Sequence, residues 1–363
     1  MRVQAFGSFD VARHPRVGIL IDGLRAHGVI VDVCNEPLAL STADRVQMLK
    51  QPWRLPLLAL TLLRTWFTLV RRSRRLPSPD AVLVGYLGHF DVLLARRLFR
   101  GVPIVHDMLI FASDTARDRG AGGLKQRLLR GLDRAAIRAS DLVVVDTDEH
   151  LAMLPNDADG VVVPVGAPVA WAGPAPSPRP GPLRVVFFGL YTPLQGAPVI
   201  GEALRLLSGL LGPDIEVTMI GSGQDLALTR SLAGTAQVTW RDWVDPSELP
   251  ALVQGHDVCL GIFSAAGKGT RVVPNKVYQG AAAGCAVITS DTAPQRRALG
   301  DAAVLVPPGD PAALAAALEL LATDRTRLLK LRRSAWELAQ VAYLPEAVAA
   351  PLLVRLQEKG LPA

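Results

Sequence analysis

Residues 267–288, GKGTRVVPNKVYQGAAAGCAVI, hold the side chains of this sequence best suited to bind an anion. Lys268, Arg271 and Lys276 lie on both sides of Pro274, which suits the first turn of a helix, and Gly284 suits its end. A helix start presents free backbone N–H groups and a partial positive charge, so cations beside it favour a bound diphosphate. The other interpretation is a solvated basic loop before a helix that packs closely on a sheet.

Two residues of the expected helix extend this candidate site. Lys276 and Gln279 are three positions apart in the sequence, so they share a helix face. The amine can touch a phosphate while the amide reaches a neighbouring hydroxyl. The segment therefore predicts a ligand that carries both phosphate and hydroxyl groups.

The elements that must position these residues alternate between strands and helices. Runs rich in Val and Ile, such as VIVDVC, AVLVGY, PIVHD and DLVVVDT, are separated by amphipathic stretches, and LRVVFFGL restarts the alternation after residue 182. This pattern is typical of βαβ units around parallel sheets. In such sheets, ligands bind outside the carboxyl ends of the strands.

A proline-rich run separates the two halves of the chain and has the composition of a semi-rigid linker. We therefore expect a first α/β domain over residues 1–166, the linker over 167–182, and a second α/β domain over 183–340. A helix over 341–363 is expected to pack back on the first domain.

Composition limits the classes of function. The chain has 363 residues with a formal charge of +6, and half of them are hydrophobic, which is enough for two domain cores. The charge suits phosphorylated ligands, nucleic acid or an anionic membrane. Nucleic acid is not expected, because the basic residues lack a recognition motif or interleaved aromatic residues for base stacking.

Cys34, Cys259 and Cys285 have neither metal-ligand nor disulfide-framework spacing, which suits a reducing cytosol. The first residues lack the features of a signal peptide, so a cytoplasmic location is expected. The DTD run at 146–148 suggests a metal site by its two carboxylates, but it closes a strand and opens a helix, which favours a helix cap.

Residues 52–75, PWRLPLLALTLLRTWFTLVRRSRR, combine an apolar stretch with Trp53, Trp66 and a terminal group of arginines. The apolar part is shorter than the ~20 residues of a spanning helix and contains Arg64, so it should not cross a bilayer. It is either an interfacial helix on an anionic membrane leaflet or a buried helix with a solvated basic end. The first alternative would place the protein peripherally on the inner face of the cell membrane.

The second half of the chain resembles a known family. The runs FFGLYTPLQGAPVIGEALRLL, VTMIGSGQD, VTWRDWVDPSELPALVQGHDVCLGIFS, KGTRVVPNKVYQGAAAGCAVITSDTAPQRRAL and VLVPPGDPAALAAAL follow one another as in the second domain of family 4 glycosyltransferases. The first half is similar more loosely, through the Gly7 loop, VHD at 105–107, and DLVVVDTDEHL followed by VVPVG.

The resemblance implies a GT-B fold, with two Rossmann-like parallel-sheet domains that face a central cleft. It also implies a retaining glycosyltransferase without a required metal or other cofactor. A nucleotide-diphosphate sugar would bind mainly to the second domain, and a saccharide or lipid-linked acceptor to the first, in the synthesis of cell-surface polysaccharide or glycolipid. The positions that match the family's donor site are Gly7, Gly189, Gly221, Trp243, Val244, Asn275 and Gln279.

On the acceptor side, the resemblance places His106 at a strand end near the donor sugar and the acceptor. A lone histidine can equally be structural. Asp107 and Asp114 are candidate polar groups for the acceptor, and Asp114 can alternatively cap a helix.

The chain departs from the family at four positions. Family members usually carry two glutamates eight positions apart, and the matching positions here are Arg271 and Gln279. Two usual cations are replaced by Leu190 and Gln195. Our hypothesis is that Lys268, Arg271 and Lys276 replace the diphosphate clamp and stabilise the leaving group. The alternatives are a non-catalytic sugar-nucleotide sensor or partner subunit, and a GT-B nucleotide-sugar epimerase.

Overall fold

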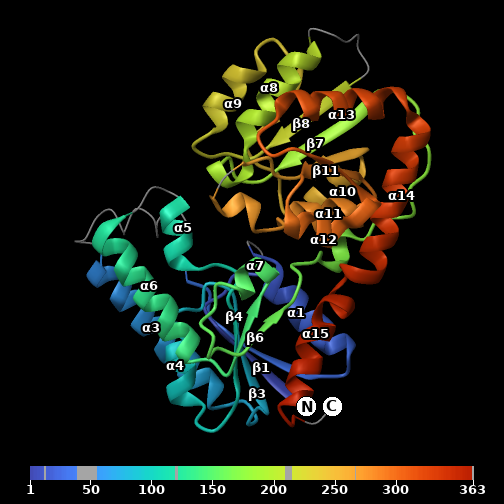
Figure 1. The fold of residues 1–363 in the computed structure, drawn as a ribbon. Coiled ribbons are helices and arrows are strands. Elements are labelled where there is room, and N and C mark those ends of the chain that lie inside the picture. The colour runs from blue at the N-terminus through green and yellow to red at the C-terminus, as the bar shows by residue number, and fades with distance from the viewer. Residues whose placement is uncertain (12–13, 39–54, 119–121, 209–214, 266, 362–363) are drawn as a thin grey trace.

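The computed structural model describes the chain except for residues 12–13, 39–54, 119–121, 209–214, 266 and 362–363. It contains two six-stranded sheets whose paired strands are all parallel, each flanked by helices on both faces (Figure 1). The expectation of two parallel-sheet α/β domains is therefore confirmed. The domain bounds expected from the sequence stay a prediction.

The first sheet has the strand order β2-β1-β3-β4-β5-β6. Its chain order alternates strands and helices as the sequence pattern predicts, because each parallel pair needs a crossover connection. The elements are β1 (Arg2–Gly7), α1 (Arg16–Ala26), β2 (Ile30–Asn35), α3 (Leu55–Ser73), β3 (Ala81–Val84), α4 (Asp91–Leu98), β4 (Ile104–Asp107), α5 (Ala112–Asp118), α6 (Gly123–Arg138), β5 (Leu142–Val145), α7 (Asp148–Leu151) and β6 (Gly160–Val162).

Two helical layers cover this sheet. Helix α1 and the last helix of the chain, α15 (Pro345–Glu358), pack on one face through residues that include Leu20, Leu24 and Leu352. Helices α3, α4 and α6 cover the other face, where Leu69, Val92 and others share one core cluster with the strands. Figure 1 shows these three helices together on the side of the sheet away from α1 and α15.

The second sheet has the strand order β12-β11-β10-β7-β8-β9. Its elements are η2 (Val169–Trp171) in the linker, then β7 (Leu183–Phe188), η3 (Pro193–Gln195), α8 (Ala197–Ser208), β8 (Ile215–Ile220), α9 (Leu226–Ala233), β9 (Val238–Arg241), α10 (Leu249–Gln254), β10 (Val258–Leu260), η4 (Gly267–Thr270), α11 (Asn275–Ala282), β11 (Ala286–Ser290), α12 (Ala293–Leu299), η5 (Gly300–Ala302), β12 (Ala303–Val306), α13 (Pro311–Thr323) and α14 (Arg325–Ala342). Helices α8 and α13 pack on one face, and α11 and α14 on the other.

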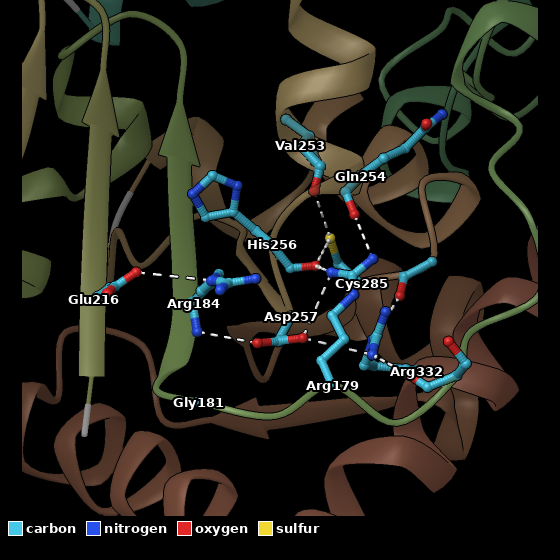
Figure 2. A network of polar contacts seen from close by, with 12 residues as sticks. Arg179, Gly181, Arg184, Glu216, Val253, Gln254, His256, Asp257, Cys285 and Arg332 are labelled. Atoms are coloured by element: carbon cyan, nitrogen blue, oxygen red, sulfur yellow. Dashed lines mark hydrogen bonds and ion pairs between the residues drawn. The ribbon is translucent and has the colours of Figure 1, made fainter.

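The proline-rich segment is anchored to the amino ends of the second sheet's strands. Asp257, just before β10, accepts a hydrogen bond from the Arg184 amide (3.1 Å), and its Oδ1 lies 3.6 Å from Arg179 Nη1 and 3.5 Å from Arg332 Nη1. Arg332 also donates to the Ser177 carbonyl oxygen (2.9 Å). Figure 2 shows Asp257 with Arg184 on one side and with Arg179 and Arg332 on the other. Ion pairs and hydrogen bonds of arginines thus hold the linker in place, in addition to the restricted backbone of its prolines.

Helices α14 and α15 return the chain from the second domain to the first. By length and mean hydropathy, Arg325–Glu358 is the one helical stretch of the described residues that could cross a membrane, which is weak evidence. Much of its apolar surface is packed within the protein, because Ala335 and Ala339 belong to the core of the second domain and Val348 and Leu352 to that of the first. The stretch therefore serves as core helices that join the domains.

Candidate active site between the domains

The contacts between the domains lie at the carboxyl ends of both sheets. Helix α5, which follows β4, contacts η4, which follows β10. Arg297 of α12 forms ion pairs with Asp148 (2.8 Å) and Glu149 (2.5 Å), which follow β5. The loops in which parallel sheets bind ligands therefore face one another across the domain boundary.

In the second domain, two glycine turns form the floor of the candidate donor site. Gly189 follows β7 with φ of 134°, and Gly221 follows β8 with φ of 122°, a range that favours glycine. A Cβ on Gly221 would lie 1.9 Å from the Gly189 carbonyl oxygen. Only glycine permits this backbone approach, so both positions expected from the sequence meet in one place.

Lys276, in the first turn of α11, lies beneath this floor. Its side chain is buried at 4% exposure, and Nζ donates a 2.6 Å hydrogen bond to Gln195 Oε1. Nζ also lies 3.6 Å from the centre of the Phe187 ring and 3.3 Å from where a Gly189 Cβ would stand. Burial lowers the pKa of Lys276 to about 7. Within the described part of the chain, no carboxylate lies within ion-pair distance of this amine.

The start of α11 adds backbone donors to this amine. Pro274 precedes the helix in an extended conformation without a side-chain cap, and Asn275 is the first helical residue and partly buried. Helix starts leave their first N–H groups without intrahelical partners, which suits an anion. One turn further, Gln279 is buried on the same helix, and Lys268 is buried in the preceding 3₁₀ turn.

Arg271 is held by the first domain. Its Nη2 lies 2.8 and 2.9 Å from the two carboxylate oxygens of Asp114, which also accepts a hydrogen bond from Arg117 (2.6 Å). Thr147 Oγ1 donates to the Arg271 carbonyl oxygen (2.9 Å). The structure thus joins Arg271 and Asp114, assigned to opposite sides of the site by the sequence, in one ion pair across the domain boundary.

Trp243 and Val244 follow β9 in the second domain. Trp243 is 70% exposed, whereas Val244 packs partly against the core cluster around α11. An exposed indole presents a flat apolar face that a planar group such as a nucleobase can stack on. Most of the Trp243 side chain is open to solvent in the structure.

The first domain contributes the turn after β1. Gly7 has φ of 142°, and a Cβ there would lie 3.0 Å from Asp91 Oδ2. The Ser8 amide and hydroxyl both donate to that oxygen (2.8 and 2.7 Å), and Trp66 Nε1 donates to Asp91 Oδ1 (3.0 Å). Asp91 holds the turn in place, and sequence reasoning missed it because an acid in the first turn of a helix has no distinguishing signal.

His106, at the end of β4, is fully buried, and neither ring nitrogen has a hydrogen-bond partner in the structure. Burial, together with the neighbouring His89, lowers the pKa of His106 to about 3, so the ring is neutral at physiological pH. The two rings meet edge to face at 5.6 Å between centroids, and His89 Nε2 lies 3.1 Å from Asp133 Oδ1. His89 and Asp133 were not expected from the sequence.

Asp107 lies on the core side of the same strand end. It is fully buried and pairs with Arg16, whose Nε lies 2.8 Å from Oδ1. Arg16 also donates to the carbonyl oxygens of Val163 and Pro164 (3.0 and 2.6 Å). The structure gives Asp107 an internal ion pair that ties α1 to β4 and β6.

One further sequence expectation can be compared with the structure. Thr147 caps α7 by accepting a hydrogen bond from the His150 amide, so the helix-cap interpretation of the DTD run is confirmed. Cys34, Cys259 and Cys285 are free and buried. A cavity of about 290 Å³ lies beside Arg179 of the linker and Arg332 of α14, at the amino ends of the strands and on the edge opposite the candidate site.

Comparison with known proteins shows where this architecture occurs. Residues 182–324 match the family model described as Glycosyl transferases group 1, and no curated protein matches. The fold of nearly the whole chain matches sucrose-phosphate synthase from Thermosynechococcus elongatus, at a TM-score of 0.72 and 16% identity, over 99% of this chain and 100% of the other.

Two more solved structures are similar over almost their full length. HepE from Anabaena, in complex with UDP and glucose, has a TM-score of 0.68 and 14% identity over 99% of this chain and 100% of its own. A structure described as trehalose-6-phosphate from E. coli bound with UDP-2-fluoro glucose has a TM-score of 0.69 and 14% identity, with 99% of both chains covered. The protein therefore has the GT-B fold, and its second domain matches the group 1 glycosyltransferases.

Proposed function

We propose that this protein is a glycosyltransferase that moves a sugar from a nucleotide-diphosphate donor to an acceptor hydroxyl. The observation that supports this most is Lys276, a buried amine under the glycine floor of the second domain, without a carboxylate partner among the described residues. Buried charges are normally paired. A diphosphate at the start of α11 would supply the missing negative charge.

In the proposed reaction, the bond between the anomeric carbon and the phosphate oxygen breaks, and its electron pair passes to the diphosphate. Lys276 and the neighbouring Lys268 and Arg271 stabilise the charge that develops there. The acceptor oxygen attacks the same face of the sugar, and its proton passes to the leaving phosphate oxygen. The anomeric configuration is retained, and no side chain is required as a general base.

Arg271 has to change partner to join this clamp. In the structure, its guanidinium is neutralised by Asp114 at 2.8 Å. A diphosphate carries more negative charge than one carboxylate, so it can compete for the guanidinium through paired hydrogen bonds. Donor binding would thereby weaken one contact between the domains.

We propose that His106 acts as a neutral hydrogen-bonding group next to the sugar and the acceptor. Its low pKa makes a charged role unsuitable near pH 7. Neither ring nitrogen has a hydrogen-bond partner in the structure, although buried polar atoms in proteins are nearly always hydrogen-bonded. A bound substrate could supply these partners, which favours a role in binding.

We also propose that Lys268, Arg271 and Lys276 neutralise the diphosphate in place of a divalent metal. The acceptor would be a saccharide or a lipid-linked sugar, in the synthesis of cell-surface polysaccharide or glycolipid on the cytoplasmic side of the membrane. EDTA in the transfer assay tests the first part, because a clamp made of side chains predicts unchanged turnover.

A non-catalytic sugar-nucleotide sensor is the second candidate. The observation that favours it is the Arg271–Asp114 ion pair, because it neutralises one cation of the proposed clamp, at the position where the family resemblance implies a glutamate. Such a sensor would bind the nucleotide sugar without releasing the nucleotide.

Thermal unfolding against UDP, GDP, TDP and ADP and their common sugars, followed by a transfer assay with the stabilising donor, separates these candidates. Saturation at about 100 times the dissociation constant adds about 2.7 kcal/mol to the free energy of unfolding. We expect one nucleotide to stabilise the protein and its sugar to appear on a saccharide or lipid acceptor. Stabilisation without nucleotide release would support the sensor, and an altered sugar without an acceptor would support an epimerase.

A further inference from the structure

We infer that helices α3 and α6 of the first domain form a docking face for an anionic lipid bilayer. This inference does not depend on the transfer reaction proposed above. Both helices lie in the layer that packs on α4, with α3 contacting β2 and α4, and α6 contacting α4 and α5. Their outward sides therefore belong to one side of the molecule, opposite α1 and α15 (Figure 1).

The inward side of α3 is a regular domain contact. Leu69 is buried in the core cluster that includes α4, Ser73 accepts a hydrogen bond from Gln4 (3.1 Å), and Trp66 donates to Asp91 (3.0 Å). The helix is thus fully held by its own domain. Trp66 belongs to this inner side, and Trp53 lies outside the described residues.

The outward side of α3 is apolar, although its inward side already packs the helix against its own domain. Leu57, Leu60, Leu63 and Phe67 are spaced by three or four residues, so they form one stripe, and each is between 47% and 70% exposed. Scattered exposed leucines are common, but a continuous stripe on one helix marks an interaction surface. The buried-helix interpretation of residues 52–75 therefore accounts for only half of this helix.

Helix α6 repeats the same feature. Leu124 and Leu128, four residues apart, are 73% and 66% exposed, whereas Ala136 and Ile137 further along face the core. The exposed leucines of α6 therefore lie in its first two turns, ahead of the residues that pack on the core.

The charges around these stripes identify the partner. Residues 55–75 and residues 123–138 each contain five basic residues, and Asp133 is the one acidic residue in the two segments. Asp133 is buried and accepts from the Ala112 and Ser113 amides, so it does not reach the surface. Arg72 is paired with Glu36 at 2.8 Å. The other basic residues therefore give the two helices a positively charged surface.

A face that joins apolar stripes to a cationic rim suits a membrane better than other anionic partners. Nucleic acid would use the arginines but gains little from aliphatic side chains such as Leu63 and Leu124. At a bilayer, the leucines enter the boundary between headgroups and acyl chains while the arginines contact anionic headgroups. An anionic leaflet complements both features.

The test is sedimentation of the full chain with vesicles of equal parts phosphatidylglycerol and phosphatidylcholine, and with phosphatidylcholine alone. We expect binding to the anionic vesicles that weakens as salt rises, and little binding to the neutral ones. Leu63→Asp with Phe67→Asp, and separately Leu124→Asp with Leu128→Asp, should each lower the apparent partition coefficient at least tenfold. These side chains are exposed, so circular dichroism and the unfolding temperature should stay near those of the wild type.

A matched control is Leu228→Asp on α9 of the second domain, which is 52% exposed and lies outside the docking face. It should bind vesicles as the wild type does. Two results would overturn the inference: no binding to anionic vesicles, or wild-type binding by both aspartate pairs. If Arg127→Glu with Arg130→Glu removes binding while the aspartate pairs do not, adsorption is purely electrostatic and the apolar stripes have no part in it.

Discussion

Two features of Lys276 have opposite effects on the protonation of its amine. The amine is buried, which favours its neutral form, yet it lies where the proposed donor would place two negative phosphates. A nearby opposite charge favours the protonated form, so donor binding should raise the pKa of Lys276 above its value of about 7 in the free protein. Binding and protonation are then linked.

This linkage predicts the pH dependence of donor affinity. Above pH 7, the diphosphate must bind together with a proton, so affinity for a sugar nucleotide should fall up to about tenfold per pH unit as pH rises from 7 to 9. A sugar nucleotide is the right probe, because its phosphates do not titrate in that range. Calorimetry at several pH values measures the effect, and in Lys276→Met the affinity should be low and flat.

The same pKa sets the sign of the effect on stability. Between pH 7 and the ordinary lysine range near 10.5, the unfolded chain holds a proton that the folded protein lacks, so this residue makes stability rise with pH. Lys276→Met should remove that rise and stabilise the empty protein at pH 7. A variant that is less stable than the wild type would show that the amine has a structural partner that outweighs its burial.

Replacing His106 should raise the stability of the protein and lower its activity. A buried polar group without a hydrogen bond costs about 1–3 kcal/mol, so His106→Leu, which keeps a similar volume, should raise the unfolding temperature. Sugar transfer should fall at the same time if the ring contacts the substrate. Loss of stability in this variant would mean that the imidazole is satisfied within the core.

At the scale of elements, the packing of α1 against α15 ties the C-terminal segment to the first domain. A Cβ on Gly23 of α1 would lie 2.0 Å from the Pro345 carbonyl oxygen and 2.5 Å from the Ala349 side chain. Either the two helices separate or the backbone shifts, and both disturb a close-packed contact.

Gly23→Ala should therefore destabilise the protein by about 1–3 kcal/mol, as overpacking typically does. Gly131→Ala is the matched control, because Gly131 lies inside α6 and a Cβ there meets no atom within 4 Å. That change should stabilise the protein by roughly 0.5–1 kcal/mol, through the better helix propensity of alanine. Urea unfolding of both variants measures the difference, and equal effects would contradict the packing of α15 on α1.

Much of the element structure could be predicted from sequence, because it depends on local periodicity and on breakers. Pro274 and Gly284 bracket α11 as expected, and the alternation of strands and helices leads to two parallel sheets. The candidate site was less predictable. The contact of Lys276 with Gln195 joins residues 81 positions apart, and no local pattern reports such a pairing.

At the scale of the whole molecule, the two domains meet through charges that the proposed donor would disturb. Arg271 pairs with Asp114 over 157 positions of sequence, and Arg297 pairs with Glu149 over 148. The sequence placed Arg271 on the donor and Asp114 near the acceptor, but it could not show that they neutralise each other. The pair makes domain contact and donor binding competitors for one guanidinium.

Asp114→Asn tests this competition. With the carboxylate gone, Arg271 is available to a diphosphate, so donor affinity should rise by about threefold to tenfold, a change typical of one partly buried charge pair. Asp301→Asn, at an exposed position of the second domain, is the control and should leave affinity unchanged. Weaker donor binding in Asp114→Asn would show instead that the ion pair positions Arg271 for the ligand.

The central claim is that Lys276 holds a nucleotide diphosphate in the second domain. Calorimetric titration with the nucleotide diphosphate that stabilises the wild type, repeated on Lys276→Met and on Lys330→Met, tests it most directly. Lys330 is exposed on α14, so its variant controls for the loss of one charge. We predict at least tenfold weaker binding to Lys276→Met and unchanged binding to Lys330→Met. Equal affinity of all three proteins would contradict the account.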